Sequence, residues 1–291
     1  MRSGTVLILG RPNVGKSTLL NNIIGKKVAI TSPKPQTTRF AIQAVYSDER
    51  GYILFLDTPG IFGKTKDSLS QKINQNTLKA INQGADVVIY MVDHTRKRDY
   101  EESKVLGIVR QLTKPKKILV INKIDKLKPS YLSQYKFLFQ EFDDVQIISA
   151  LKRKHLKPLI ESIFKFLPEK KTSELKEILK GKPLPVLNIN SRIYLEELIR
   201  EKIFLLTRKE LPYTTFVKVE QMEEKPNKVY YIKAIIYTTE DRYKRMLIGK
   251  NGSMIKKIGQ FARKELELFL NHKVFLDLEI EVNRHWQESF E

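Results

Sequence analysis

The chain has 291 residues, enough for two ordinary domains that each bury a core of their own. It contains no Cys, which excludes disulfides, zinc–thiolate sites and thiol catalysis, and its 41% hydrophobic content is that of a globular protein. A net charge of +20 favours a polyanionic partner, although lysines spread along the whole chain could also serve solubility alone.

The first predicted elements are a strand, Val6–Leu9, and a helix, Lys16–Ile24. The segment that joins them fits the phosphate-binding pattern G-x-x-x-x-G-K-[ST] in the strand-to-helix context that this pattern needs. Its glycines let backbone N–H groups point at phosphate oxygens, Lys16 can reach the β- and γ-phosphates, and the Ser17 hydroxyl can hold Mg²⁺. A glycine turn without a ligand is the alternative. We expect the phosphate contacts to come from Gly10, Arg11, Pro12, Asn13, Val14, Gly15, Lys16, Ser17 and Thr18.

Strand-like apolar runs and amphipathic helical stretches then alternate as far as Phe166, which predicts an α/β fold with a mostly parallel six-stranded sheet. A turn at Arg50-Gly51 makes the second and third strands the antiparallel pair. The remaining predicted strands are Phe40–Tyr46, Tyr52–Leu56, Val87–Val92, Ile118–Ile121 and Val145–Ile148. The remaining predicted helices are Leu69–Gln83, Glu101–Leu112, Tyr131–Phe142 and Leu156–Phe166.

Three polar motifs follow predicted strands at their carboxyl ends, where open α/β sheets bind ligands. In Asp57-Thr58-Pro59-Gly60 the Asp can hold Mg²⁺ through its water shell, and the Gly60 amide can meet a γ-phosphate. In Asn122-Lys123-Ile124-Asp125 the Asp can accept N1–H and N2–H₂ of guanine, Lys123 can lie along the base, and Asn122 can tie this loop to the phosphate loop. In Ser149-Ala150-Leu151 the Ala150 amide can donate to guanine O6. A polar turn that caps a helix is the alternative for the second motif.

Prolines and a glycine between about Leu167 and Pro185 mark a domain border, so we predict a first domain of residues 1–167, a linker of 168–190 and a second domain of 191–291. The second domain reads as α-β-β-α-α-β. Its predicted elements are Ser191–Leu206, Thr214–Val219, Val229–Tyr237, Arg242–Ile248, Ser253–Leu270 and Val274–Ile280.

A G-x-x-G loop, Gly249-Lys250-Asn251-Gly252, joins the last two helices of this domain. In this order of elements the glycines let a nucleic-acid backbone approach, while a helix-turn-helix with solvated lysines is the alternative. Trp286 is either a cap on the core or a base-stacking residue, and we favour the cap. The four histidines show no metal-ligand spacing and are interpreted as incidental. The candidate RNA-binding residues are Ile248, Gly249, Lys250, Asn251, Gly252, Ile255, Lys256 and Lys257.

The motifs of the first half resemble those of the translation-factor-like GTPases, and the whole chain closely resembles the Era family of bacterial GTPases. Further residues carry the second resemblance: Thr18-Leu19-Leu20-Asn21, Pro35-Gln36-Thr37-Thr38-Arg39, and Leu211-Pro212-Tyr213 before a K-homology domain. The resemblance implies a GTPase domain followed by a smaller α+β type II K-homology domain that binds the 3′ end of small-subunit ribosomal RNA. It implies GTP, GDP and Mg²⁺ as ligands and a role in assembly of the small ribosomal subunit.

The resemblance also assigns roles to single residues. Thr38, with Thr37 as the fallback, would close over Mg²⁺ and the γ-phosphate, so that Lys16, Thr38 and Gly60 form the catalytic set and Ser17, Thr38 and Asp57 the Mg²⁺ set. Many GTPases carry Gln where Ile61 stands, which implies slow unaided hydrolysis. Asn13 resembles the residue that helps to hold K⁺ in cation-dependent relatives, and the alternative is that its side chain only satisfies the loop's own amides.

The chain departs from the Era pattern at two places. Arg153 replaces a usual Gly, and Glu279 and Glu281 give the last strand an acidic outer face that we do not expect to bind RNA. Two other functions remain alternatives: an RNA-binding module whose nucleotide pocket only stabilises the fold, and a GTPase of the tandem or tRNA-modifying kind. The early first strand leaves no room for a signal peptide, so we expect a cytoplasmic monomer and leave contact with a membrane surface open.

Overall fold

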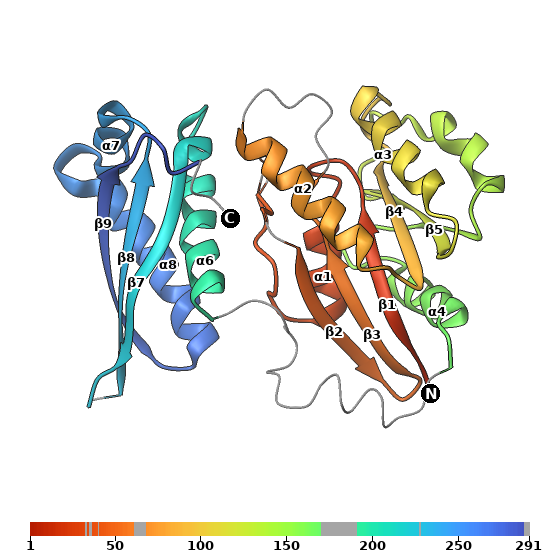
Figure 1. The fold of residues 1–291 in the computed structure, drawn as a ribbon, viewed down its shortest axis with the longest axis horizontal. Helices are drawn as coiled ribbons and strands as arrows, with labels where there is room; N and C mark the ends of the chain where they lie inside the picture. The colour runs from red at the N-terminus through yellow and green to blue at the C-terminus, as the bar shows by residue number, and fades with distance from the viewer. Residues whose placement is uncertain are drawn as a thin grey trace. The chain divides into compact units, whose positions relative to one another are not determined.

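The computed structural model describes residues 1–32, 34, 37–39, 41–60, 68–169, 191–226 and 228–287. The chain divides into two compact units, Met1–Asn188 and Ile189–Glu291, which are described one at a time (Figure 1). Most of the predicted linker lies outside the described residues, so the bounds 1–167, 168–190 and 191–291 stay predictions.

The first unit is built on a six-stranded sheet with the strand order β2-β3-β1-β4-β5-β6. Only β2 and β3 pair antiparallel, across the turn predicted at Arg50-Gly51, and the other neighbours are parallel. The predicted sheet is therefore confirmed. The strands are β1 (Arg2–Leu9), β2 (Ile42–Asp48), β3 (Gly51–Asp57), β4 (Val87–Asp93), β5 (Lys116–Asn122) and β6 (Asp144–Ile147).

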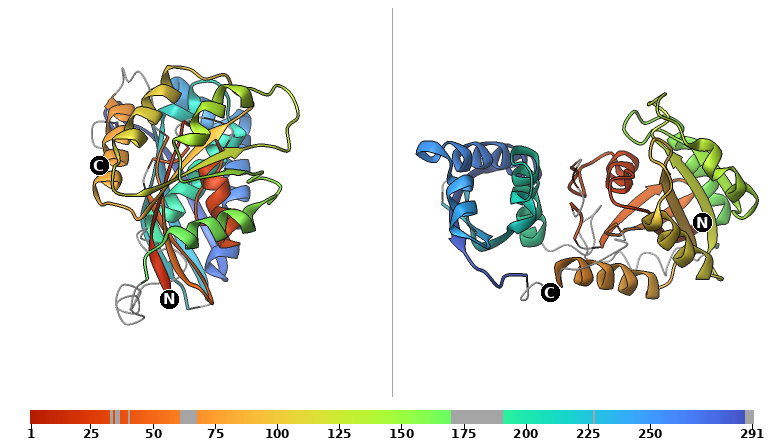
Figure 2. Two further views of the ribbon diagram at one scale, coloured as in Figure 1. Left: turned by 90° about the vertical axis from the view of Figure 1, so that its right-hand side faces the viewer. Right: turned by 90° about the horizontal axis from the view of Figure 1, so that it is seen from above.

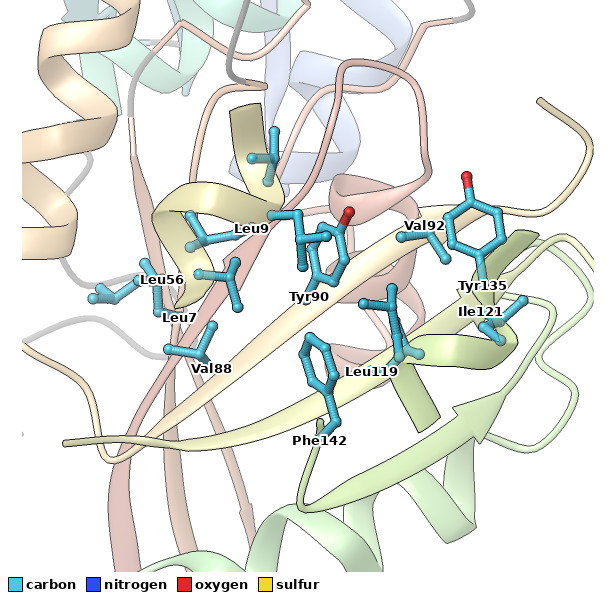
Figure 3. Close-up of a cluster of buried hydrophobic side chains, with 14 residues drawn as sticks. Leu7, Leu9, Leu56, Val88, Tyr90, Val92, Leu119, Ile121, Tyr135 and Phe142 are labelled. Atoms are coloured by element: carbon cyan, nitrogen blue, oxygen red, sulfur yellow. The ribbon is translucent and has the colours of Figure 1, made fainter. Parts of the chain in front are cut away.

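Helices cover both faces of this sheet: α2 and α3 lie on one face, and α1 and α4 on the other (Figures 1 and 2). Their bounds are α1 (Lys16–Ile24), α2 (Ser68–Asn82), α3 (Tyr100–Gln111) and α4 (Leu156–Phe166). On the α3 face, apolar side chains such as Leu9, Tyr90 and Leu119 form a buried cluster (Figure 3). Successive side chains of a strand point to opposite faces of the sheet. A strand whose two faces are both buried therefore has an unbroken apolar sequence.

The α-helix predicted over Tyr131–Phe142 is wrong, because this segment forms 3-10 turns, η1 (Leu132–Gln140). Its core-facing residues Leu132, Tyr135 and Leu138 recur every three positions. That spacing matches the three residues per turn of a 3-10 helix and brings all three side chains onto the sheet.

The second unit has the predicted α-β-β-α-α-β order, with a three-stranded sheet, β7-β8-β9, in which β7 and β8 are antiparallel and β8 and β9 parallel. Trp286 is a cap on this unit, since it is 2% exposed, stacks on Phe216 and donates from Nε1 to the carbonyl of Thr214 over 2.9 Å. Its elements are α6 (Ser191–Leu206), η2 (Leu211–Thr214), β7 (Thr215–Glu224), β8 (Val229–Thr238), α7 (Asp241–Ile248), η3 (Lys250–Gly252), α8 (Ser253–Leu270) and β9 (Lys273–Val282).

Nowhere in the described ranges is a helix both long and apolar enough to cross a bilayer.

Candidate functional site

The loop between β1 and α1 depends on two glycines. Gly15 has φ 107°, and a Cβ there would lie 2.4 Å from Nδ2 of Asn122. A Cβ on Gly10 would lie 2.4 Å from the carbonyl oxygen of Met91. Both positions therefore exclude any side chain, and the loop can hold its curled path at the amino end of α1, where helix amides and the helix dipole favour an anion.

Lys16 curls over this loop and donates from Nζ to the carbonyl oxygens of Gly10 and Arg11, over 3.0 and 3.1 Å. Burial lowers the pKa of Lys16 to about 8, and the negative charge of Asp57 offsets part of that shift. The ammonium group thus lies beside the loop amides, where a phosphate group would restore the charge that burial disfavours.

Three oxygen-bearing side chains meet at the start of α1. The Ser17 hydroxyl donates to Oδ2 of Asp57 over 2.7 Å, and its oxygen lies 3.0 Å from Oγ1 of Thr38. Since Ser17 has only one hydroxyl proton, Thr38 is the donor in the second contact. Thr37 instead donates to the carbonyl oxygen of Lys34 over 2.6 Å, so Thr38 is the threonine at this cluster.

The same cluster is chemically suited to Mg²⁺. Burial raises the pKa of Asp57 to about 6, against the lowering effects of Lys16 and Ser17. Its second oxygen, Oδ1, is buried without a hydrogen-bond partner among the described residues. A hard divalent cation prefers oxygen ligands and would stabilise the charged form of this carboxylate.

The Asp57-Thr58-Pro59-Gly60 segment closes against the phosphate loop. A Cβ on Gly60 would lie 2.6 Å from the backbone nitrogen of Pro12, so only glycine fits there. Thr58 does not face the ligand site, because its hydroxyl donates to the carbonyl oxygen of Ile8 over 2.8 Å and its side chain is fully buried. Ile61 lies outside the described residues.

These segments border a cleft with an empty volume of about 430 Å³ that includes open solvent. Three segments line this cleft. They are the phosphate loop with the start of α1 (Pro12, Asn13, Gly15, Lys16, Ser17 and Thr18), the stretch that holds Ile30, Thr31, Ser32, Thr37 and Thr38, and Gly60. Residues from three distant parts of the sequence thus surround one space at the carboxyl edge of the sheet.

Asn122 ties two further loops to the phosphate loop, as its motif predicts. Its Nδ2 donates to the carbonyl oxygen of Val14 over 2.7 Å, and its Oδ1 accepts from the Ala150 amide over 2.9 Å. In this structure the Ala150 amide donates to Asn122, and its donation to guanine O6 stays a prediction. Asp125 accepts a short hydrogen bond from the Ser149 hydroxyl, so Ser149 orients the carboxylate that would read the base.

The end of β4 contributes side chains that the sequence did not single out. Asp93 accepts from Nζ of Lys123 over 2.6 Å, and Lys123 also donates to the carbonyl oxygen of Asn13 over 2.9 Å. His94 Nε2 donates to the carbonyl oxygen of Lys123 over 3.0 Å, and its Nδ1 is hydrogen-bonded to the Ser130 hydroxyl over 3.1 Å. His94 is thus not incidental, although a lone histidine after a strand gives no sequence signal.

Arg11 is the predicted phosphate contact that the structure turns away from the cleft. Its guanidinium is fully buried and forms ion pairs of 2.7 Å with both Asp99 and Glu102. Tyr90 donates to the same Glu102 over 2.5 Å. Only the backbone of Arg11 remains available to a ligand, while its side chain joins the loop to α3.

Arg153 stands where the Era pattern carries Gly. Its φ of 53° lies in the left-handed region, which suits Gly better than a residue with a side chain. Its Nε donates to Oδ1 of Asn22 over 2.8 Å, and Asn22 donates to the carbonyl oxygen of Ala150 over 2.7 Å. The side chain thus offsets the backbone strain by holding the Ser149-Ala150-Leu151 turn against α1.

In the second unit, the loop between α7 and α8 has three residues with positive φ: Gly249 at 72°, Asn251 at 51° and Gly252 at 74°. A Cβ on Gly249 would lie 2.8 Å from the backbone nitrogen of Met254. Ile248 and Ile255 are half-buried beside the loop. Lys250, Lys256 and Lys257 are exposed there, whereas Ile258 is fully buried in the core.

A phosphate loop, a switch segment that ends in Gly60, a guanine-type base motif and a type II K-homology fold together define a GTPase with an attached K-homology domain. Family models agree: one described as "50S ribosome-binding GTPase" matches residues 5–123, and one described as "KH domain" matches residues 210–287.

Relatives narrow the class further. GTPase Era of Halothermothrix orenii is 38% identical, with 99% of this chain and 95% of that protein covered, and GTPase Era of Thermotoga maritima is 40% identical, with 99% and 94% covered. The chain belongs to the Era family of GTPases, which hydrolyse GTP.

Solved structures support the same assignment. An Aquifex aeolicus Era variant bound to GDP and AlF4⁻ superposes with a TM-score of 0.89 at 35% identity, covering 99% of this chain and 96% of that one. An Era complex with MgGDPNP and nucleotides 1506–1542 of 16S ribosomal RNA gives a TM-score of 0.88 at 36% identity, covering 99% and 95%.

Proposed function

We propose that this GTPase is a Mg²⁺-dependent switch whose second unit binds the 3′ end of small-subunit ribosomal RNA during assembly of the small subunit. The observation that carries the nucleotide half is the convergence of Ser17, Thr38 and Asp57 beside Lys16. The RNA half is supported by the K-homology fold, its exposed Gly249–Gly252 loop and the related Era that binds 16S ribosomal RNA.

In the hydrolytic step, Lys16 would donate to the β- and γ-phosphate oxygens, and loop amides between Asn13 and Thr18 would hold the remaining oxygens. Bound Mg²⁺ would supply charge neutralisation for the phosphates, held by Ser17, Thr38 and Asp57. The Gly60 amide would register whether a γ-phosphate is present, which makes this segment the switch.

Guanine recognition would come from Asp125, oriented by Ser149, with Lys123 held along the base by Asp93. The Asp carboxylate accepts from two guanine donors that adenine lacks. The Ala150 amide, which donates to Asn122 in this structure, would donate to guanine O6 when the base is bound.

Asn13 lines the cleft, and a K⁺ ion held by its side-chain oxygen would place positive charge beside the phosphates. Such an ion would compensate in part for Ile61, which cannot orient water. We further propose that the protein is a cytoplasmic monomer. Its net charge of +20 also favours peripheral contact with an anionic membrane surface.

The RNA half is tested by replacing Lys250 and Asn251 together with Asp. Two carboxylates at the G-x-x-G loop would repel the phosphate backbone, so we expect at least a hundredfold loss of affinity for the 3′-terminal ribosomal RNA with GTP binding intact. The control is Lys114→Asp with Lys154→Asp, two exposed lysines of the first unit. If the loop variant bound this RNA as tightly as the parent does, the Gly249–Gly252 loop would not be the RNA-binding site.

A further inference from the structure

We infer that the first unit carries a second RNA contact, a basic surface that binds the phosphate backbone of ribosomal RNA at a distance in sequence from the Gly249–Gly252 loop. It consists of Lys97, Arg98, Lys126, Lys128, Lys136 and Phe137 and is called the β4–η1 surface below. This inference rests on the proposed function, because it takes ribosomal RNA as the partner.

Hydrogen bonds and a ring contact make this surface continuous, although its residues come from two loops and η1. The Arg98 amide donates to Oε1 of Gln134 over 3.1 Å, and its guanidinium lies 4.6 Å from the centre of the Phe137 ring. The Tyr131 amide donates to the carbonyl oxygen of His94 over 2.7 Å. The loop after β4 and the segment that leads into η1 are therefore held side by side.

The charge of the surface is one-sided. No Asp or Glu occurs between Lys126 and Gln140. The bordering residues Asp93, Asp99 and Glu141 each form an ion pair, with Lys123, Arg11 and Arg110 respectively. Within the described part of the chain, Lys97, Lys126, Lys128 and Lys136 form no ion pair. Cations without internal partners raise the local potential and favour a polyanion.

The aromatic and apolar groups favour RNA over a lipid surface. Phe137 is 46% exposed under the Arg98 guanidinium, an arrangement on which an unpaired base can stack. A membrane-binding helix would need a continuous free apolar face, but Tyr135 and Leu138 of η1 are fully buried. The exposed apolar side chains Leu127, Phe137 and Phe139 alternate along the sequence with Lys126, Lys128 and Lys136.

This surface also adjoins the base-reading loop, since Lys126 follows Asp125 and its amide donates to the carbonyl oxygen of Lys123 over 2.8 Å. RNA held by Lys126 would therefore act on the segment that holds guanine. RNA bound at the β4–η1 surface would thus lie next to a loop of the nucleotide site, whereas the Gly249–Gly252 loop belongs to the other unit.

The test replaces Lys126, Lys128 and Lys136 with Gln, and the matched control replaces Lys114, Lys154 and Lys157, three exposed lysines elsewhere on the first unit. Both full-length variants are titrated with naked full-length small-subunit ribosomal RNA and with a single-stranded oligonucleotide of its 3′ end. We expect about tenfold weaker binding of the full-length RNA by the first variant and a salt slope smaller by about two to three. Oligonucleotide binding and GTP hydrolysis should match the parent, and the control should bind both RNAs normally.

Full-length RNA binding with the parent's affinity and slope would overturn the inference, as would equal losses in the control. The same variants are also titrated with assembled small subunits and with anionic vesicles. A loss confined to assembled subunits would indicate a protein partner, and a loss confined to the vesicles a membrane, so each of these results also overturns the inference. Failure of the Lys250 and Asn251 variant to lose the oligonucleotide would instead contradict the proposed function, whatever the β4–η1 surface does.

Discussion

Asp57 is a buried carboxylate that must be charged to hold a cation. Its pKa of about 6, raised by burial, means that the folded, ligand-free protein binds a proton there between about pH 4 and pH 6 that the unfolded chain releases. Ionisation of Asp57 therefore lowers the stability of the ligand-free protein as the pH rises through this range, and a bound cation reverses that cost.

We predict that the affinity of the GDP complex for Mg²⁺ falls by up to about tenfold for each pH unit below 6, because Mg²⁺ competes with the Asp57 proton. Titration of Mg²⁺ between pH 5 and pH 7.5 measures this. Asp57→Asn is the control, since it keeps the titration of GDP and removes that of the side chain. Parallel pH profiles for the two proteins would rule out Asp57 as the group responsible.

Asp125 is predicted to set base specificity. In Asp125→Asn the amide no longer accepts from both guanine donors but can pair with the extra carbonyl of xanthine, so preference should shift from GTP to XTP by at least tenfold. Competition binding measures the shift. Ser149→Ala is a useful partner variant, since it removes only the hydroxyl that orients the carboxylate. Unchanged GTP binding without a gain for XTP would reject the assignment of this loop.

Asn13 is predicted to make hydrolysis cation-dependent. If its side-chain oxygen helps to hold K⁺, hydrolysis should be at least severalfold faster in KCl than in NaCl at equal ionic strength. Asn13→Ala should remove this difference and keep nucleotide binding. Equal rates of the parent in both salts, with and without RNA, would discard the potassium site.

At the scale of elements, the sequence predicts the strands of the sheet well because their apolar runs are buried on both faces, as in β4, where every residue is buried. The helices that begin at a motif or a cap are also well placed: α1 starts at Lys16, and α3 follows Asp99, whose carboxylate accepts from the Glu102 amide. Tertiary packing decides the rest, since η1 keeps apolar residues at a spacing of three that a helix pattern also tolerates.

The loops at the carboxyl edge show where sequence reasoning about the site stops. Glycines and motif residues such as Asn122 are placed correctly because their chemistry is local and their spacing is fixed. The direction of Arg11 depends on Glu102 of a helix far along the chain, and the brace of Asp93 and His94 on Lys123 depends on the pairing of β4 with β5. No pattern in one segment reveals contacts made by another.

At the scale of the whole molecule, the proposed nucleotide site lies in one compact unit and the proposed RNA-binding loop Gly249–Gly252 in the other. Coupling between them is a difference in RNA affinity between nucleotide states, which must equal the difference in nucleotide affinity between RNA-bound and free protein. In the proposed switch, the Gly60 segment, which packs on Pro12, would change position with the γ-phosphate, together with Thr38.

The affinity of the full chain for 3′-terminal small-subunit ribosomal RNA, measured with Mg²⁺ and either a non-hydrolysable GTP analogue or GDP, tests the proposed switch most directly. We predict binding at least tenfold tighter with the GTP analogue, corresponding to a coupling of about 1.4 kcal/mol or more. Equal RNA affinities in the two nucleotide states would contradict a GTP-controlled RNA switch, even if each ligand bound tightly by itself.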